Sequence, residues 1–517
     1  MDKINNLIDE IIDGYSRSEG EKRANAEVEE TEGGESSAEE LLEVAEELYA
    51  QDRIDEAVDI WKRLAEKGVI FAQYRLGVCY YDGEGVARDY DIAAQLFEKS
   101  AKQGYAPALY NLGVCYRTGK GVEQNYGEAA VWFKAAAEAG DACGQFSYAM
   151  CLADGVGVEE DNGQAIKLVA LSAEQDYAPA KCYLGESYLN GDGVEEDKAR
   201  GVKLLDEAAQ DGYVPAMHAL AGCYEKGNGV AADLASAVRL YASAAEEEYA
   251  PSQYSLAMLY DNGNGVERDY AKAVELYKQS AEQGYPAAQN AYGWCFIVGK
   301  VVKKDVYEAV RWFRRAAEQG DMRAQYNLAM CYEEGRGVVC NTEKAFIWHM
   351  RAAKQGDDRA QLHVGWSYQV GNGVKINKKE AFNWLYLSAM QGNAQAQSDV
   401  GYCYFNGIGV KKSRREAYKW YLHAAENDSP MGAYNLAGCY RHGQGVARDG
   451  AKALEWYKRS AELGHNDARV CIAYMFERGE GVKKDLAEAV KWYKAALDGG
   501  EEAAEYYLSK KKFAKYL

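Results

Sequence analysis

The sequence predicts an all-α solenoid built from twelve 36-residue helix–turn–helix repeats. Residues 71–502 divide into twelve blocks of 36 residues without insertion or deletion, and the same turn residues recur at the same block positions. The chain also has only six prolines, which suits a mostly helical protein. One such hairpin cannot bury its apolar face alone, so neighbouring hairpins should stack on one another.

Length and charge exclude several classes of protein. The 517 residues exceed the usual size of one compact domain, so the chain holds several domains or one elongated array. The net charge is −20, and residues 1–50 carry −12 of it, with 16 acidic and 4 basic side chains. An acidic chain offers a poor phosphate-binding surface, so we expect no nucleic-acid partner. No stretch of about 18 apolar residues occurs, so we expect no membrane span. The first residues lack the pattern of a secretory signal.

Residues 1–37 form the first segment, for which we expect an amphipathic helix and an acidic tether. The helical stripe of apolar residues comprises Ile4, Leu7, Ile8, Ile11, Ile12 and Tyr15. Gly, Ser and Glu dominate the tether that follows. This arm either docks into a groove of its own chain or of another subunit, or it is a frayed terminus.

The two ends of the array should be capped. Residues 38–70 have the pattern of a helical hairpin but lack the G-x-G-V turn of the later blocks. Residues 503–517 begin like another first helix, and Ser509 and a run of lysines then replace the packing residues. We therefore expect a capping hairpin at one end and a capping helix at the other, because solenoid ends need a polar face.

Each block, with Phe71 as position 1 of the first, should contain two helices. Positions 1–12 carry apolar or small residues at helical spacing and predict a helix A. Glycine stands at position 13 in all twelve blocks and at position 15 in eleven, Val301 being the exception, and can end helix A in a tight turn. Position 19 is Asp, Asn or Ser in every block, so helix B should begin there.

The repeated pattern A-x-x-x-L-G-x-x-Y-x-x-G-x-G-V-x-x-D-x-x-K-A-x-x-W-Y-x-K-A-A-E-x-G resembles the Sel-one-like repeat (SLR), a relative of the tetratricopeptide repeat. The resemblance covers residues 71–502, and residues 38–70 are closer to the tetratricopeptide type. It implies a right-handed α/α superhelix whose A helices line the concave face. It also implies an adaptor that assembles other proteins into complexes.

A partner should bind where the repeats differ from one another. Positions 5, 8 and 12 share one side of helix A, and the departures there concentrate in the second half of the array. Large aromatic side chains in a concave site are typical binding anchors. The candidate partner-binding residues are Trp294, Ile297, Val298, Asn327, Met330, Trp366, Tyr402 and Tyr474. The alternative is that these residues only repack the local core.

Cysteines and histidines show no pattern of a metal or disulfide site. Eight of the twelve cysteines stand at position 9 of helix A. Equivalent atoms in neighbouring hairpins should lie about 8–10 Å apart, too far for a disulfide, so we expect reduced core thiols in a cytoplasmic protein. No C-x-x-C occurs, and the six histidines show no H-E-x-x-H or paired spacing, so we expect no metal and no cofactor.

Together these features predict a non-enzymatic scaffold that binds a partner protein or peptide on its concave face. A catalytic residue should be singular, whereas nearly every distinctive residue here is periodic, and no G-x-S-x-G motif stands out. Two alternatives stay open. One is a β-lactam-hydrolysing or penicillin-binding cysteine-containing relative, and the other is a structural spacer without a specific ligand.

Overall fold

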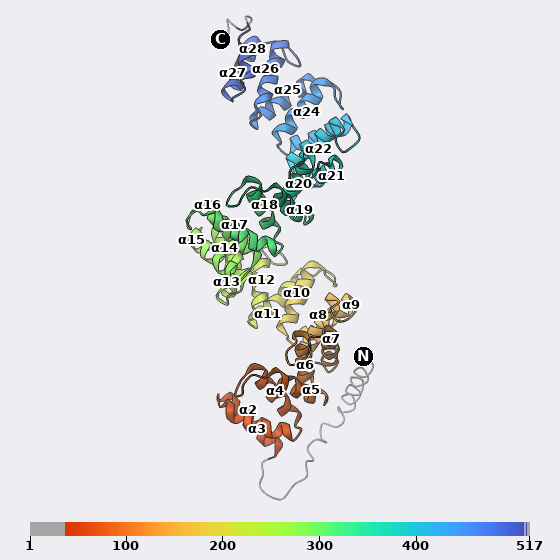
Figure 1. Ribbon diagram of the computed structural model, residues 1–517, viewed down its shortest axis with the longest axis vertical. Helices are drawn as coiled ribbons and strands as arrows, with labels where there is room; N and C mark the ends of the chain where they lie inside the picture. Colours follow the sequence, from red (N-terminus) through yellow and green to blue (C-terminus); the bar gives the residue numbers. More distant parts are fainter. Residues whose placement is uncertain (1–36, 511–512, 514–517) are drawn as a thin grey trace. The chain divides into compact units, whose positions relative to one another are not determined.

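The computed structural model describes residues 37–510 and residue 513, and all regular structure within them is helical (Figure 1). There are 27 helices in this part of the chain, arranged as consecutive antiparallel pairs. The predicted array of paired helices is therefore confirmed. The amphipathic helix and tether expected in residues 1–37 lie outside the described residues, apart from Ser37. No helix among those described is long and apolar enough to cross a membrane.

The helices fall into two compact units, which divide between Glu267 and Arg268. The first unit holds the capping hairpin and the first five complete repeats, followed by the A helix of the sixth. Its helices are α2 (Ala38–Ala50), α3 (Ile54–Glu66), α4 (Ile70–Asp82), α5 (Tyr90–Ala101), α6 (Ala106–Thr118), α7 (Tyr126–Glu138), α8 (Ala142–Asp154), α9 (Asn162–Glu174), α10 (Ala178–Asn190), α11 (Lys198–Gln210), α12 (Val214–Lys226), α13 (Leu234–Glu246) and α14 (Ala250–Asn262).

The second unit begins with the B helix of the sixth repeat and continues to the C-terminal cap. Its helices are α15 (Tyr270–Glu282), α16 (Pro286–Val298), α17 (Val306–Glu318), α18 (Met322–Glu334), α19 (Thr342–Lys354), α20 (Asp358–Val370), α21 (Lys378–Met390), α22 (Ala394–Asn406), α23 (Arg414–Glu426), α24 (Pro430–His442), α25 (Gly450–Glu462), α26 (Asn466–Arg478), α27 (Leu486–Asp498) and α28 (Ala503–Leu508).

The turn between helices A and B forms as its residues predict. Helix A ends at the position-13 glycine in a left-handed conformation, as Gly83 does with φ +79°. Helix B begins after the position-19 residue, whose side chain accepts hydrogen bonds from the first backbone amides, as Asp89 does from Asp91 and Ile92. All twelve predicted N-cap residues make such a bond.

The second turn glycine, at position 15, lies against the start of helix B of the preceding repeat. A Cβ added to Gly337 would stand 2.6 Å from the carbonyl oxygen of Val306, the first residue of α17. The same distance separates a Cβ on Gly229 from the Lys198 oxygen in the first unit. A larger side chain at position 15 would push the hairpins apart. Where the sequence has Val301 instead, the valine is half exposed.

A buried glutamine at position 3 connects three helices. Gln325 is only 4% exposed, and its Nε2 donates to the Ala317 carbonyl at 3.2 Å near the end of α17. Its Oε1 accepts from Gln355 at 2.8 Å, after the end of α19. The bond from position 33 to position 3 recurs in six repeats, at Gln73, Gln145, Gln289, Gln325, Gln361 and Gln397. The bond at Oε1 thus joins the two helices of one repeat, and the bond from Nε2 of Gln325 joins that repeat to the preceding one.

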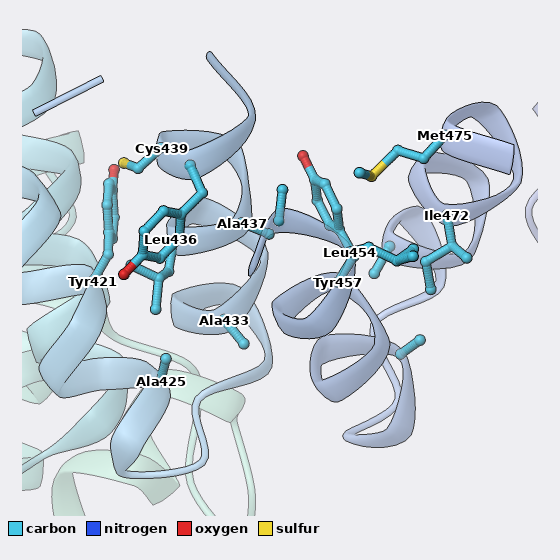
Figure 2. Close-up of a cluster of buried hydrophobic side chains, with 14 of the residues drawn as sticks. Tyr421, Ala425, Ala433, Leu436, Ala437, Cys439, Leu454, Tyr457, Ile472 and Met475 are labelled. Atoms are coloured by element: carbon cyan, nitrogen blue, oxygen red, sulfur yellow. The ribbon is translucent and has the colours of Figure 1, made fainter. Parts of the chain in front are cut away.

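The hydrophobic core is also shared between repeats. In the cluster drawn in Figure 2, Tyr421 from α23, Leu436 from α24, Tyr457 from α25 and Ile472 from α26 are buried together. Small residues such as Ala433 and Ala437 lie between them and let the helices approach closely. Because each cluster draws on adjacent hairpins, no block buries its apolar face by itself.

Aromatic side chains pack at both ends of the described array. The fully buried Trp61 of α3 packs under the guanidinium of Arg75, 4.6 Å from its ring centroid. At the other end α28 covers Ala503–Leu508, within the residues 503–517 for which a capping helix is expected. Phe513 is then fully buried, with its ring 5.8 Å from that of Tyr493, and closes the last core cluster.

The contact at position 15 can be tested with Gly337→Ala. We expect the free energy of unfolding to fall by about 2–4 kcal/mol, because the new methyl meets the Val306 carbonyl at a positive φ. Gly320→Ala is the matched control, since φ is +98° there and nothing lies within 4 Å of an added Cβ. It should cost only about 1–2 kcal/mol. Chemical denaturation followed by circular dichroism measures both, and equal losses would contradict the stacking contact.

Candidate functional site

An open groove lies on the second unit, across the A helices α16, α18 and α20. Its volume is about 640 Å³. Most of its lining side chains come from these three helices, and the loop before α20 and the end of α21 complete it. The lining residues are Asn290, Trp294, Met322, Arg323, Asn327, Gly356, Asp357, Asp358, Arg359 and Gln391. The groove therefore spans three consecutive repeats.

Two asparagine side chains form a polar strip along the groove. Nδ2 of Asn327 on α18 donates to Oδ1 of Asn290 on α16 at 2.9 Å. This bond fixes both carboxamide planes. Nδ2 of Asn290 can then donate to a ligand, and Oδ1 of Asn327 can accept from one. A donor and an acceptor held side by side match the amide group of a peptide backbone.

Trp294 provides the apolar part of the groove. It stands one helical turn after Asn290 on α16 and is 53% exposed. A large exposed indole beside fixed amides is the usual composition of a protein-binding anchor, since it contributes apolar area at a low cost in side-chain entropy.

Several side-chain contacts connect the residues at the charged end of the groove. Oδ1 of the buried Asp357 accepts from the Ala360 amide at 2.8 Å and caps α20, and its Oδ2 accepts from Arg359 at 2.8 Å. The Arg359 guanidinium also lies 4.2 Å from the centroid of the Tyr326 ring. Gln391 holds the loop before α20 by donating to the Gly356 oxygen at 2.9 Å. These contacts link the side chains at this end of the groove to one another and to the backbone.

The structure brings two of the eight predicted binding residues into the groove, Trp294 and Asn327. Ile297 and Met330 are half-buried, and Ile297 packs against the core cluster of α17 and α18. Val298, at the end of α16, is 45% exposed but does not line the groove.

The other predicted aromatics are separate from the groove. The Nε1 of Trp366 donates to Oδ2 of Asp399 at 2.7 Å. Burial raises the pKa of Asp399, and this bond from the indole stabilises its ionised form. Tyr402 is 49% exposed on α22, and the Tyr474 ring is contacted by the guanidinium groups of Arg441 and Arg478 at 4.7 and 5.0 Å.

The first unit has a smaller groove at equivalent block positions. Its volume is about 300 Å³, and its lining includes Tyr74, Val78, Asn111 and Val114. Valine stands there at position 8, where the groove of the second unit has Trp294. The two grooves thus share lining positions 4, 5 and 8 of helix A and differ at position 8, the residue best suited to anchor a ligand, and at position 4.

One cluster of functional side chains was missed at the sequence level. No metal site was expected, because the histidines lack a recognised spacing. The structure brings Glu333, His349 and His363 together, with their ligand atoms all within 4.8 Å of one another. The three residues lie on three successive helices, 16 and 14 positions apart, and such spacing matches no linear metal motif.

The position-9 cysteines lie in the core or at its edge, and none of the chain's twelve cysteines is paired. Burial raises the pKa of the Cys115 and Cys439 thiols to about 11 and that of Cys403 to about 12. A nucleophilic cysteine needs the opposite shift, toward the thiolate at neutral pH. These thiols are therefore packing residues.

Cys340, the exposed cysteine, should be alkylated much faster than the buried ones. Raising a thiol pKa by two units lowers the thiolate fraction about 100-fold, so Cys115 and Cys403 should react at least that much more slowly. Iodoacetamide labelling of the native protein, followed by peptide mass spectrometry, measures the rates. Cys340→Ser should remove the fast phase and Cys403→Ser should leave it. Equally fast labelling of Cys403 would contradict its burial.

Paired helices with a left-handed glycine turn and a groove across the A helices define a helical-repeat protein of the tetratricopeptide-like class. The family model for the Sel1 repeat matches the chain twelve times, and this chain belongs to that family. The matched residues are 70–105, 106–141, 144–177, 178–213, 214–249, 250–285, 286–321, 323–357, 358–393, 394–429, 430–465 and 468–501. The resemblance found in the sequence is thereby confirmed.

Solved structures of bacterial proteins show the same repeat. The chain is 31% identical to a protective antigen present in uropathogenic Escherichia coli strains that displays an SLR fold, over 88% of this chain and 97% of that one, with a TM-score of 0.57. It is 27% identical to a Sel1 repeat protein from Oxalobacter formigenes, over 66% and 89% of the two chains, with a TM-score of 0.44. No curated protein matches the chain significantly.

Proposed function

We propose that this protein is a non-enzymatic scaffold that binds an extended peptide segment of a partner protein in the groove across α16, α18 and α20. Repeats of this class typically mediate protein interactions. The observation that supports the site is the combination of the exposed Trp294 with the Asn290–Asn327 pair in one groove.

The chemistry of the groove favours an extended segment over a folded surface. An extended backbone presents its amide groups to the side, where the carboxamides of Asn290 and Asn327 can pair with them. The exposed indole of Trp294 then receives an apolar side chain of the same segment. Arg323 and Asp358, of opposite charge, stand along the groove and favour a ligand that carries both charges.

A binding role accounts for the chain better than catalysis does. The thiols of the core carry raised pKa values, which makes them poor nucleophiles for a hydrolase of the cysteine-containing kind. Buried, unpaired thiols also suit a reducing compartment, so a cytoplasmic location belongs to the proposal. The acidic balance of the chain disfavours nucleic acid as the partner.

Selection of a random peptide library on the full-length protein tests the proposal. Peptides that bind the wild type are expected to lose affinity on the order of 30-fold with Trp294→Ala, because a buried aromatic anchor contributes about 2 kcal/mol or more. Asn327→Ala should weaken the binding of the same peptides, since it removes the Oδ1 acceptor and leaves the Asn290 carboxamide free to rotate. Isothermal titration calorimetry gives the dissociation constants.

Tyr402→Ala is the matched control, because Tyr402 is an aromatic of nearly equal exposure outside the groove. It should leave peptide affinity unchanged. Circular dichroism should show all three variants folded. Peptides that lose affinity with Tyr402→Ala and keep it with Trp294→Ala would overturn the proposed site.

A further inference from the structure

Glu333 of α18, His349 of α19 and His363 of α20 meet in one cluster. The three helices follow one another along the array (Figure 1). Oε2 of Glu333 lies 3.3 Å from Nε2 of His349 and 3.2 Å from Nδ1 of His363. The two imidazole rings stack with their centroids 4.6 Å apart and their planes at 10°. His349 is 1% exposed, whereas Glu333 and His363 are half-buried and face solvent on one side.

The cluster is a departure from the repeat, since His349 replaces a residue that elsewhere serves packing and His363 stands at a position that varies between repeats. Position 27, where His349 stands, is aromatic or aliphatic in the other eleven blocks, and position 5 is histidine only at His363. In two other repeats a tyrosine at position 27 donates to a glutamate at position 11, as Tyr241 does to Glu225 at 2.9 Å. In those repeats one tyrosine bonds to the glutamate, whereas here two histidines contact it.

The charges of the cluster match those of metal ligands. Hydrogen bonds from His349 and His363 hold the pKa of the Glu333 carboxyl well below its usual range, so Glu333 is an anion. Burial lowers the pKa of the His349 imidazole. A carboxylate oxygen and imidazole nitrogens are ligand atoms that zinc takes in proteins.

From this geometry we propose that Glu333, His349 and His363 bind one divalent transition-metal ion, with Zn²⁺ the best match. Zinc bonds of about 2.0–2.1 Å in a tetrahedral site place ligand atoms about 3.3 Å apart, and the two distances to Glu333 already have this length. A rotation of the half-buried His363 ring brings its Nδ1 into range of the same ion. Two imidazoles and one carboxylate leave a fourth position open to water or to a partner's side chain.

The surroundings of the site support a cation. The rings of Tyr326 and Trp366 stand edge-on to His363, with centroids 5.9 and 5.3 Å away, and form an aromatic wall. Asp357 adds a negative charge, and it is paired with Arg359, the nearby basic group. The guanidinium of Arg359 also lies over the Tyr326 ring, 4.2 Å from its centroid.

Zinc titration of the full-length, tag-free protein tests the site. After removal of bound metal with a chelator, calorimetry should show one equivalent of Zn²⁺ bound per chain. His363→Ala and His349→Tyr should weaken this affinity by on the order of 100-fold or more. His349→Tyr is the conservative variant, because tyrosine at this position bonds to glutamate in two other repeats. Zinc should raise the melting temperature of the wild type and leave that of His349→Tyr unchanged.

Two further variants separate this site from other metal-binding side chains. Cys340→Ser removes an exposed thiol that contacts the Glu333 carbonyl oxygen at 3.3 Å but does not belong to the cluster of ligand atoms, and His423→Ala removes an exposed imidazole on α23. Both variants should bind Zn²⁺ as the wild type does. Cobalt(II) bound to the wild type should give the strong visible absorption of a tetrahedral site. The proposal is overturned if the wild type takes up no stoichiometric zinc, if His349→Tyr binds it equally well, or if Cys340→Ser abolishes binding.

Discussion

The stacking of each hairpin on the preceding one determines which positions of the repeat must keep the same residue type and which can vary. A loop glycine at position 15 lies against the first turn of the preceding helix B, and a buried glutamine at position 3 bonds to the end of the same helix. Both contacts join neighbouring repeats only, as the shared core clusters do. Stability in each unit is therefore a sum of repeat and nearest-neighbour contributions, and the residues that make these contacts have to recur.

The exposed side of helix A is free from this constraint. In the second unit Asn290, Asn327 and Trp294 stand at positions 4, 5 and 8 of helix A, and all three line the groove. The glutamate–histidine cluster uses position 5 of the next repeat together with one position of helix B and one of helix A. The periodic array thus carries two features that depart from the repeat, the groove residues and the glutamate–histidine cluster, on neighbouring helices. Their side chains are held by contacts such as the Asn327–Asn290 bond rather than by flexible loops.

The conformation of residues with a strong local backbone preference could be predicted from the sequence alone. The position-13 glycines and the position-19 N-caps act within one turn, so their structure follows from residue type and spacing. Trp294 and Trp366 share position 8, yet only Trp294 lines the groove, because the next repeat offers Asp399 to the indole of Trp366. The hydrogen bonds of the position-3 glutamines and the stacked His349–His363 pair could not be predicted from the sequence for the same reason. The partners of these residues lie in neighbouring helices and leave no linear motif.

Hydrogen exchange of the full-length protein, with and without a selected peptide, tests most directly whether the departures from the repeat carry the function. The account predicts slower exchange on peptide binding in α16, α18 and α20, where the groove residues lie, and little change in α4 and α6, which frame the smaller groove of the first unit. Protection confined to α4 and α6, or spread evenly over all the A helices, would contradict it.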